Sequence, residues 1–332
     1  MDEPLVSVLM MAYEVRALIE KSIQSVLQQK TSFPYELVIG EDFSTDGTRD
    51  IVFEYKNRYP EIIRVVTSDH NVGMIENFVR TMKACRGKYI AYCDGDDQWS
   101  KSYKLQKQAE YLEDNPECGL VYSNFDLFYV GSGRNIPNYN NYNGRDVPGK
   151  PELKDFFLEL KPKGGTRIGV RTCTVMLRRD LCMRLVESDP FLHQSDHFLM
   201  NDTQLWAEMA AISKLHYIPE SMAIYNVRDE SVSWSRNKNK SLRYLVSTAE
   251  MFIYLCNKYN LPESIRKRQE RTFHDASLRL AFYNKNRELA DNIVSGMPSL
   301  DWKNFLYYWG MRNKYTHTLV DTIIRVKNIF RK

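Results

Sequence analysis

Residues 4 to about 130 alternate between strand-like and helix-like hydrophobic patterns. Continuous apolar runs of strand length lie at residues 5–13, 35–41, 62–68, 88–93 and 119–130. Between them, residues 17–30, 48–60 and 74–87 carry apolar side chains at helical spacing, with Gly87 expected as the C-cap of the third helix. Apolar strands separated by amphipathic helices predict an α/β fold, in which a mostly parallel sheet is covered by helices on both faces.

The pattern changes after residue 130. Residues 131–151 are rich in Asn, Tyr and Gly, which predicts an exposed loop. A short helix is expected at 152–160, a strand leading into a helix at 172–187, and a helix at 201–214. From about Ser241 onward the sequence predicts helices only.

Composition and charge narrow the class of protein. The 332 residues are 43% hydrophobic with a net charge of +4, which fits a globular chain and is too mild to argue for nucleic acid. Six scattered cysteines form no CxxC pair and several lie in apolar runs, so we expect buried thiols in a reducing compartment. No apolar stretch approaches the ~18 residues of a spanning helix, and we predict a cytoplasmic protein.

Acidic residues gather where two of the predicted strands end. Glu41 and Asp42 follow the second strand, and Asp94, Asp96 and Asp97 follow the fourth. Ligands of parallel sheets bind beyond these carboxyl ends, and closely spaced carboxylates suit Mg²⁺ or Mn²⁺. An acidic turn stabilised by hydrogen bonds to its own backbone explains the same string equally well.

Common nucleotide-binding motifs are missing. No GxGxxG follows the first strand and no GxxxxGK[ST] occurs, which argues against dinucleotide and P-loop pockets. A nucleotide would therefore be held by carboxylates and a metal ion, with Asp42 placed to accept a hydrogen bond from a base N–H or a sugar hydroxyl.

Five segments together resemble the family 2 glycosyltransferases, which are inverting enzymes of the Rossmann-like GT-A fold. They occur in order, and the closest resemblance is to bacterial members that build surface polysaccharides. The segments are VSVLMMAYE (6–14), ELVIGEDFSTDGT (36–48), HNVGMIENF (70–78), GKYIAYCDGDDQW (87–99) and NDTQLWAEMA (201–210).

The resemblance implies a role for individual residues. Tyr13 would stack on the nucleotide base with Glu14 beside it, and Asp42 would accept from the base, typically uracil. Asp96 would hold the ribose or the metal, and Asp97 would be the main metal ligand. Asp202 would be the catalytic base, although its position alone also suits the N-cap of the following helix.

The sequence departs from the family pattern at two places. Asn201 precedes Asp202 where many members carry a second acidic residue, and Arg228 stands where a His is frequent in the closing loop 225–233. We expect Arg228 to meet the donor diphosphate directly, because a guanidinium suits phosphate oxygens. No QxxRW occurs, which speaks against processive synthases.

The resemblance implies transfer of a sugar from a nucleoside diphosphate, UDP by expectation, to a saccharide or lipid-linked acceptor. The expected GT-A domain spans residues 1–235, with a nucleotide-binding half (1–130) and an acceptor-binding and catalytic half (131–235). A helical extension follows at 236–332, for which acceptor binding, homodimer formation and peripheral membrane contact stay open. A non-catalytic nucleotide-sugar-binding protein and a nucleotidyltransferase are the alternatives.

Overall fold

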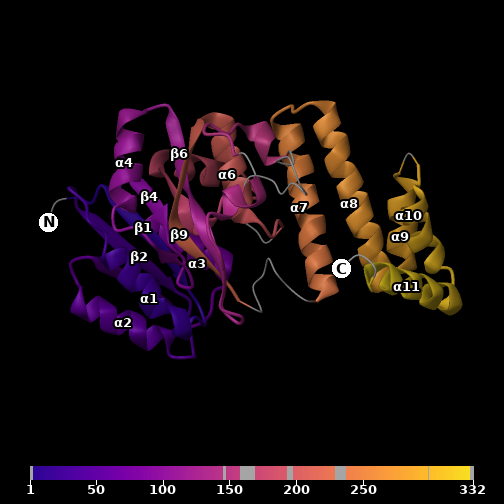
Figure 1. Ribbon diagram of the computed structural model, residues 1–332, viewed down its shortest axis with the longest axis horizontal. Helices are drawn as coiled ribbons and strands as arrows, with labels where there is room; N and C mark the ends of the chain where they lie inside the picture. The colour runs from indigo at the N-terminus through magenta and orange to yellow at the C-terminus, as the bar shows by residue number, and fades with distance from the viewer. Residues whose placement is uncertain are drawn as a thin grey trace. The chain divides into compact units, whose positions relative to one another are not determined.

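The computed structural model describes residues 3–144, 147–157, 169–192, 197–228, 237–297 and 299–329 (Figure 1). The chain divides into two compact units, residues 1–197 with 201–229 and residues 198–200 with 230–332. The domain boundary expected after residue 235 lies outside the described residues and stays a prediction.

The first unit is built on one mixed sheet in the order β3-β2-β1-β4-β8-β6-β9-β5, with β7 added beside β6. Its strands are β1 (Val6–Ala12), β2 (Tyr35–Glu41), β3 (Ile63–Val66), β4 (Tyr89–Tyr92), β5 (Gln98–Trp99), β6 (Cys118–Tyr129), β7 (Arg134–Ile136), β8 (Val175–Arg178) and β9 (Lys214–Val227). The α/β class predicted from the alternating pattern is confirmed.

Strand direction differs between the two halves of this sheet. Strands β3, β2, β1 and β4 are parallel, as predicted. Strand β8 runs antiparallel to both β4 and β6, and β9 runs parallel to β6 but antiparallel to β5. The carboxyl ends of β1, β2 and β4 therefore meet along one edge, and the later strands complete the sheet in mixed directions.

Helices cover the sheet because each presents one apolar face. In the helix predicted at 17–30, Ile19, Ile23 and Val26 are fully buried in the main core, whereas Leu27 is only partly buried. The helices of this unit are α1 (Arg16–Leu27), α2 (Thr48–Arg58), α3 (Met74–Ala84), α4 (Lys104–Asp114), α5 (Arg179–Ser188) and α6 (Asn201–Ile212).

Several sequence-based boundaries need correction. Helix α3 ends at Ala84, and Cys85 continues with extended backbone, so Gly87 is not its C-cap. The expected loop 131–151 contains β7 and a 3₁₀ turn (Tyr139–Gly144). The helix expected at 152–160 is a 3₁₀ turn at Leu153–Phe156, and residues 158–160 lie outside the described part.

The second unit consists of helices, in agreement with the prediction for the chain after Ser241. They are α7 (Lys238–Lys258), α8 (Glu263–Tyr283), α9 (Arg287–Ser295), α10 (Trp302–Gly310) and α11 (Lys314–Ile329). Phe282 of α8 is fully buried and packs edge-on against Tyr307 and face-on against His317. In the part of the chain that the structure describes, no helix combines the length and apolarity needed to cross a bilayer.

All six cysteines are buried and none is paired in a disulfide. Burial raises the pKa of Cys85 and Cys182 to about 12, which keeps both as neutral thiols. This arrangement agrees with the thiols predicted from their apolar surroundings.

A buried carboxylate joins three elements at the edge of the sheet opposite the acidic clusters. Glu36 of β2 accepts hydrogen bonds from the Ser7 hydroxyl (2.7 Å), from the Arg86 amide (2.9 Å) and from the Arg86 guanidinium (2.8 Å). Arg64 of β3 lies 3.2 Å away. Burial by itself raises the pKa of Glu36, but these hydrogen bonds outweigh it and hold the pKa below its usual range.

We predict that Glu36→Gln destabilises the protein by about 2 kcal/mol near neutral pH, because charged hydrogen bonds are lost from a buried group. A lowered native pKa means that the stabilisation is present above the unfolded pKa and is lost as pH falls through the native pKa. Urea unfolding at several pH values measures this, and the difference between variant and wild type should shrink in acid. Glu54→Gln, which removes an exposed ion pair to Arg58, is the control and should change little.

Gly87 has a packing role, which gives a second prediction. A Cβ at this position would lie 2.5 Å from the backbone nitrogen of Ser7 and 2.8 Å from the carbonyl carbon of Val6. Gly87→Ala should therefore push β1 aside and cost roughly 1–3 kcal/mol in unfolding free energy. Gly149→Ala, where a Cβ meets nothing within 4 Å, is the matched control. Equal stability of both variants in urea would contradict the close approach.

Candidate nucleotide-sugar site

The predicted site residues lie at one edge of the sheet because they follow neighbouring strands. Tyr13 and Glu14 come directly after β1, Asp42 after β2, and the turn Asp94–Asp97 after β4. Strand β1 pairs with both β2 and β4 in parallel, so the three strand ends meet at the same edge.

The acidic turn after β4 is packed tightly against the end of β1. The Asp97 amide donates to the Asp94 carbonyl (3.0 Å), and the Gly95 amide donates to the Met11 carbonyl (2.8 Å). A Cβ on Gly95 would lie only 2.9 Å from that Met11 oxygen. The turn therefore holds its three carboxylates in a fixed, largely buried geometry.

Burial and mutual repulsion perturb these carboxyl groups. Burial, followed by the charges of Asp96 and Asp202, raises the pKa of Asp94 to about 7. Burial also raises the pKa of Asp97 well above its usual range, with Asp96 and Asp94 adding to the effect. Closely spaced buried carboxylates with raised pKa values are the kind of group that a cation or a basic ligand stabilises in charged form.

The end of β9 supports the same turn from the other side. The Asn226 amide donates to the Asp97 carboxylate (2.9 Å), and its side chain donates to the Asp96 carbonyl (2.6 Å). Arg228 lies with its Nε 3.1 Å from the Asp96 carboxylate and also donates to the Glu14 carbonyl (3.3 Å). Arg228 thus connects the end of β1 with the acidic turn, which the sequence did not indicate.

Asp42 is buried and already accepts two backbone hydrogen bonds. The amides of Val72 and Gly73, at the start of α3, donate to its two carboxylate oxygens (2.9 and 3.0 Å). The Arg80 guanidinium lies 3.6 Å away. Each carboxylate oxygen has a second lone pair, so a further donor such as a base N–H can still be accepted.

Tyr13 and Glu14 differ in exposure and conformation. The Tyr13 side chain is 51% exposed, so its ring is accessible for stacking. Glu14 has a φ of 51°, which is uncommon outside glycine, and its carboxylate accepts from the amide (2.8 Å) and hydroxyl (3.0 Å) of Thr45. Its side chain therefore ties the ends of β1 and β2 together.

Asp202 lies within the first turn of α6, which begins at Asn201. Asp202 is the second residue of the helix and does not precede it, so it is not the N-cap residue that its sequence position also suggested. Its exposed carboxylate accepts from the Thr203 amide (2.6 Å), as suits a helix N-terminus. The charge of Asp202 contributes to the raised pKa of Asp94, after burial and Asp96, so the two carboxylates are within electrostatic range of each other.

The donor set can be compared with the needs of a divalent cation. Among the described residues, no group of three His, Cys, Asp or Glu side chains forms a ready-made metal site. Mg²⁺ and Mn²⁺ often take only one or two protein carboxylates and complete their shell with phosphate oxygens and water. Asp96 and Asp97 fit that second pattern.

Three supporting residues, Val72, Gly73 and Asn226, escaped the sequence analysis. Asn226 lies in the expected closing loop 225–233, but no role was predicted for it. It acts partly through its backbone amide, which no side-chain pattern indicates. Gly73 acts entirely through its amide. For Asn226, the available sequence signal was a polar side chain near the end of the mainly apolar segment MAIYNV (222–227). Residues 229–233 of the expected closing loop lie outside the described part of the chain.

Comparison with known proteins adds independent information. TuaG of Bacillus subtilis, named a putative teichuronic acid biosynthesis glycosyltransferase, is 38% identical over 126 residues, which cover 38% of this chain and 48% of TuaG. WfgD of Escherichia coli, named a UDP-Glc:α-D-GlcNAc-diphosphoundecaprenol β-1,3-glucosyltransferase, is 28% identical over 243 residues, covering 73% of this chain and 84% of WfgD. Curated relatives from Mycobacterium are also similar, but the aligned region covers only 36% of their length.

A solved structure supports the fold. The mannosyltransferase PcManGT of Pyrobaculum calidifontis, in complex with GDP-Man and Mn²⁺, superposes with a TM-score of 0.58 at 16% identity, covering 100% of this chain and 88% of that one. The family model described as "Glycosyl transferase family 2" matches residues 7–184, more than half of the chain. The chain belongs to glycosyl transferase family 2.

Proposed function

We propose that this protein transfers a sugar from a nucleoside diphosphate, UDP in our assignment, to a hydroxyl of a saccharide or lipid-linked saccharide, with inversion at the anomeric carbon. The relatives named for teichuronic acid and for a diphosphoundecaprenol acceptor support a role in surface polysaccharide synthesis. The six buried free thiols suit the cytoplasm that we assign to the enzyme.

The nucleotide would lie over the ends of β1, β2 and β4. In this proposal the exposed Tyr13 ring stacks on the base beside Glu14, and Asp42 accepts from a base N–H. Asp96 holds the ribose or shares in the metal, and Asp97 is the main ligand of Mg²⁺ or Mn²⁺. A bound divalent cation supplies charge stabilisation for the departing diphosphate.

Arg228 would stabilise the diphosphate after rearrangement. Its guanidinium now lies against Asp96, and it has more than one N–H to offer. When phosphate oxygens and a cation approach Asp96, the guanidinium can turn to the diphosphate while it keeps its bond to the Glu14 carbonyl. After this turn, the negative charge that develops on the diphosphate would meet a cationic donor.

Asp202 would act as the general base. An acceptor hydroxyl is a poor nucleophile and needs its proton removed as it attacks the anomeric carbon. An exposed carboxylate at the start of α6 can take that proton from the side opposite the leaving diphosphate, which gives inversion. The observation that carries the proposed function is the turn Asp94–Asp97, whose carboxylates are held at the ends of β1, β4 and β9. The contribution of Asp202 to the raised pKa of Asp94 supports a base within electrostatic range of that turn.

The first test is binding of UDP with and without Mn²⁺, measured by calorimetry. We expect metal-dependent binding that Asp97→Asn weakens at least about tenfold, since a principal carboxylate ligand is lost. Asp114→Asn, an exposed change of the same charge at the end of α4, should bind as the wild type does. Equal binding of wild type and Asp97→Asn, with or without Mn²⁺, would overturn the metal role.

The second test separates catalysis from donor binding. Asp202→Asn keeps an acceptor for the Thr203 amide but cannot take a proton, so kcat should fall by ~10²–10⁴ while UDP affinity is unchanged. The assay is release of UDP from a panel of UDP-sugars with oligosaccharide acceptors. Unchanged kcat would remove Asp202 as the base, and release of pyrophosphate from a nucleoside triphosphate would point instead to a nucleotidyltransferase.

A further inference from the structure

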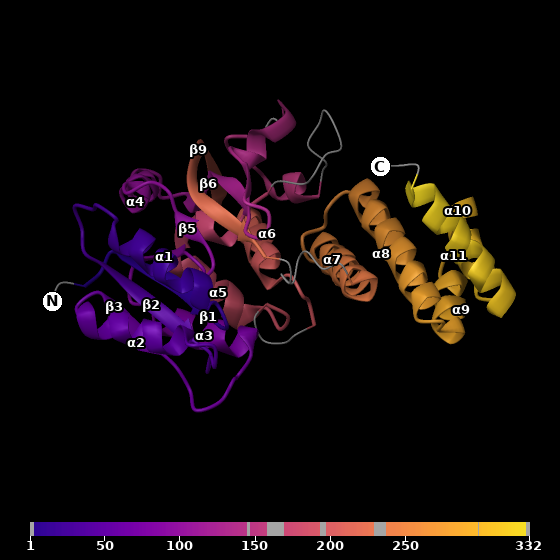
Figure 2. The ribbon, with the colours of Figure 1, turned by 60° about the horizontal axis from the view of Figure 1, so that its bottom comes forward.

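The outer faces of α10 and α11 expose large apolar side chains. On α10, Trp302 is 64% exposed and Phe305 51%; on α11, Tyr315 is 86% exposed, with Leu319 and Ile323 also exposed. Both helices lie at the C-terminal, yellow end of the chain (Figure 2). Aromatic rings left this open are uncommon on a face that contacts only water.

These side chains point outward because the opposite faces are used for packing. Tyr307 of α10 and His317 of α11 both contact Phe282 of α8, with ring centroids 5.3 and 4.2 Å apart. Trp302 and Phe305 are three residues apart and so share the other face of α10, whereas Trp309 is half-buried and packs against the core around Phe282. Tyr315, Leu319 and Ile323 follow each other at four-residue spacing along α11.

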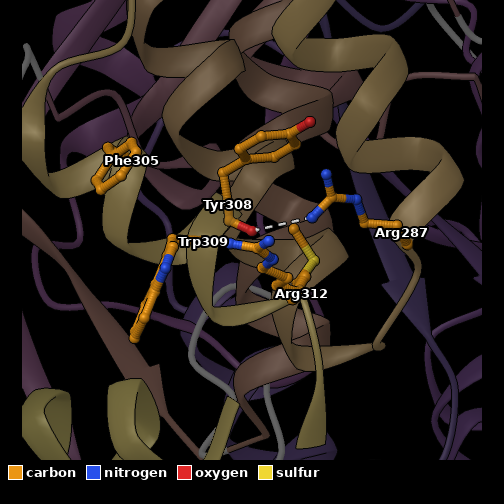
Figure 3. A pocket seen from close by; sticks show the side chains of 6 residues that line it. Arg287, Phe305, Tyr308, Trp309 and Arg312 are labelled. Atoms are coloured by element: carbon orange, nitrogen blue, oxygen red, sulfur yellow. Dashed lines mark hydrogen bonds between the residues drawn. The ribbon is translucent and has the colours of Figure 1, made fainter. Parts of the chain in front are cut away.

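A pocket of about 310 Å³ opens beside the exposed aromatic side chains of α10 (Figure 3). It is lined by Arg287, Phe305, Tyr308, Trp309, Met311 and Arg312. Arg287 lies over the Tyr308 ring, 4.2 Å from its centroid, and is paired with Asp291 (2.9 Å). The exposed Arg312 guanidinium forms no ion pair with any residue in the described ranges. The pocket therefore combines the guanidinium of Arg312, which has no acidic partner among the described residues, with the apolar rings of Phe305 and Trp309.

The charge of the chain is distributed unevenly. Residues 230–332 contain 19 Lys and Arg against 9 Asp and Glu, whereas residues 1–229 contain 27 against 33. The helical part thus carries a net charge of +10, and the part with the sheet carries −6. A positive charge of this size favours an anionic partner and disfavours a second copy of the same surface.

We propose that the α10–α11 surface, meaning the exposed faces of Trp302, Phe305, Tyr315, Leu319 and Ile323 with the Arg287–Arg312 pocket, docks on a membrane that contains anionic phospholipids. Aromatic rings with one polar edge prefer the boundary between headgroups and acyl chains. Basic residues add attraction to the negative surface. The pocket would receive a headgroup phosphate at Arg312.

The test is co-sedimentation of the full chain with vesicles. We expect binding to equal mixtures of phosphatidylglycerol and phosphatidylcholine, and much weaker binding to phosphatidylcholine alone. Arg312→Glu, which reverses one charge, should weaken partition on the order of tenfold. The pair Trp302→Ser with Phe305→Ser should weaken it by at least as much, because apolar insertion is lost.

Matched controls keep the result specific. Arg184→Glu makes the same charge change on α5, and Ile212→Ser removes an exposed apolar side chain at the end of α6; both should bind vesicles as the wild type does. Thermal unfolding and UDP binding of each variant report whether the fold is intact, independently of vesicle binding.

Three outcomes would overturn the proposal. One is equal binding to neutral and anionic vesicles, or binding to neither. Another is an equal loss of vesicle binding in the control variants. A third is sedimentation as a dimer that Trp302→Ser with Phe305→Ser converts to monomer, which would assign the surface to self-association.

Discussion

The hydrogen bond from the Asn226 amide to the Asp97 carboxylate joins parts of the first unit that are 129 residues apart in sequence. It fixes the end of β9 against the turn that follows β4, and the antiparallel pairing of β5 with β9 continues the same contact. Arg228 reaches Asp96 and Glu14 only because β9 ends there. Helix α6 leads directly into β9, so the position of Asp202 depends on the same strand. The acidic turn, the end of β1 and the cation at Arg228 therefore form one connected assembly.

Electrostatics explains why such an assembly is unusual among structural turns. Three carboxylates held in a buried turn repel one another, and protein hydrogen bonds offset only part of the cost. Arg228 is the charged partner that the structure places against Asp96, and Asn226 and the turn's own backbone supply dipoles. A structural turn would reach the same shape with fewer charges. In the proposed function, the surplus of negative charge would be balanced by a divalent cation that binds together with the donor diphosphate.

Sequence patterns predicted the parts of this molecule that depend on local periodicity. Strands β1, β2 and β4 are largely buried and β3 partly so, and their mainly apolar residues made them recognisable. The carboxylates were found because they follow those strands. Strand β9 was missed because its burial is irregular and its pairing with β6 contains register shifts. The amides that hold Asp42 and Asp97 carry no side-chain signature. Resemblance to a family indicated Asp202, whereas its electrostatic effect on Asp94 depends on tertiary structure that no local pattern encodes.

The packing of Gly95 against Met11 limits how the acidic turn can vary among related sequences. The residue between the first two aspartates faces the backbone of β1 and has no room for a side chain. Substitution there would be selected against even in a descendant that had lost its chemistry, for as long as it kept the fold. A glycine at this position therefore indicates that a related sequence keeps this packing of the turn against β1, and does not report on its activity. Aspartates 96 and 97, which reach toward β9, are the positions whose variation would report a change of activity.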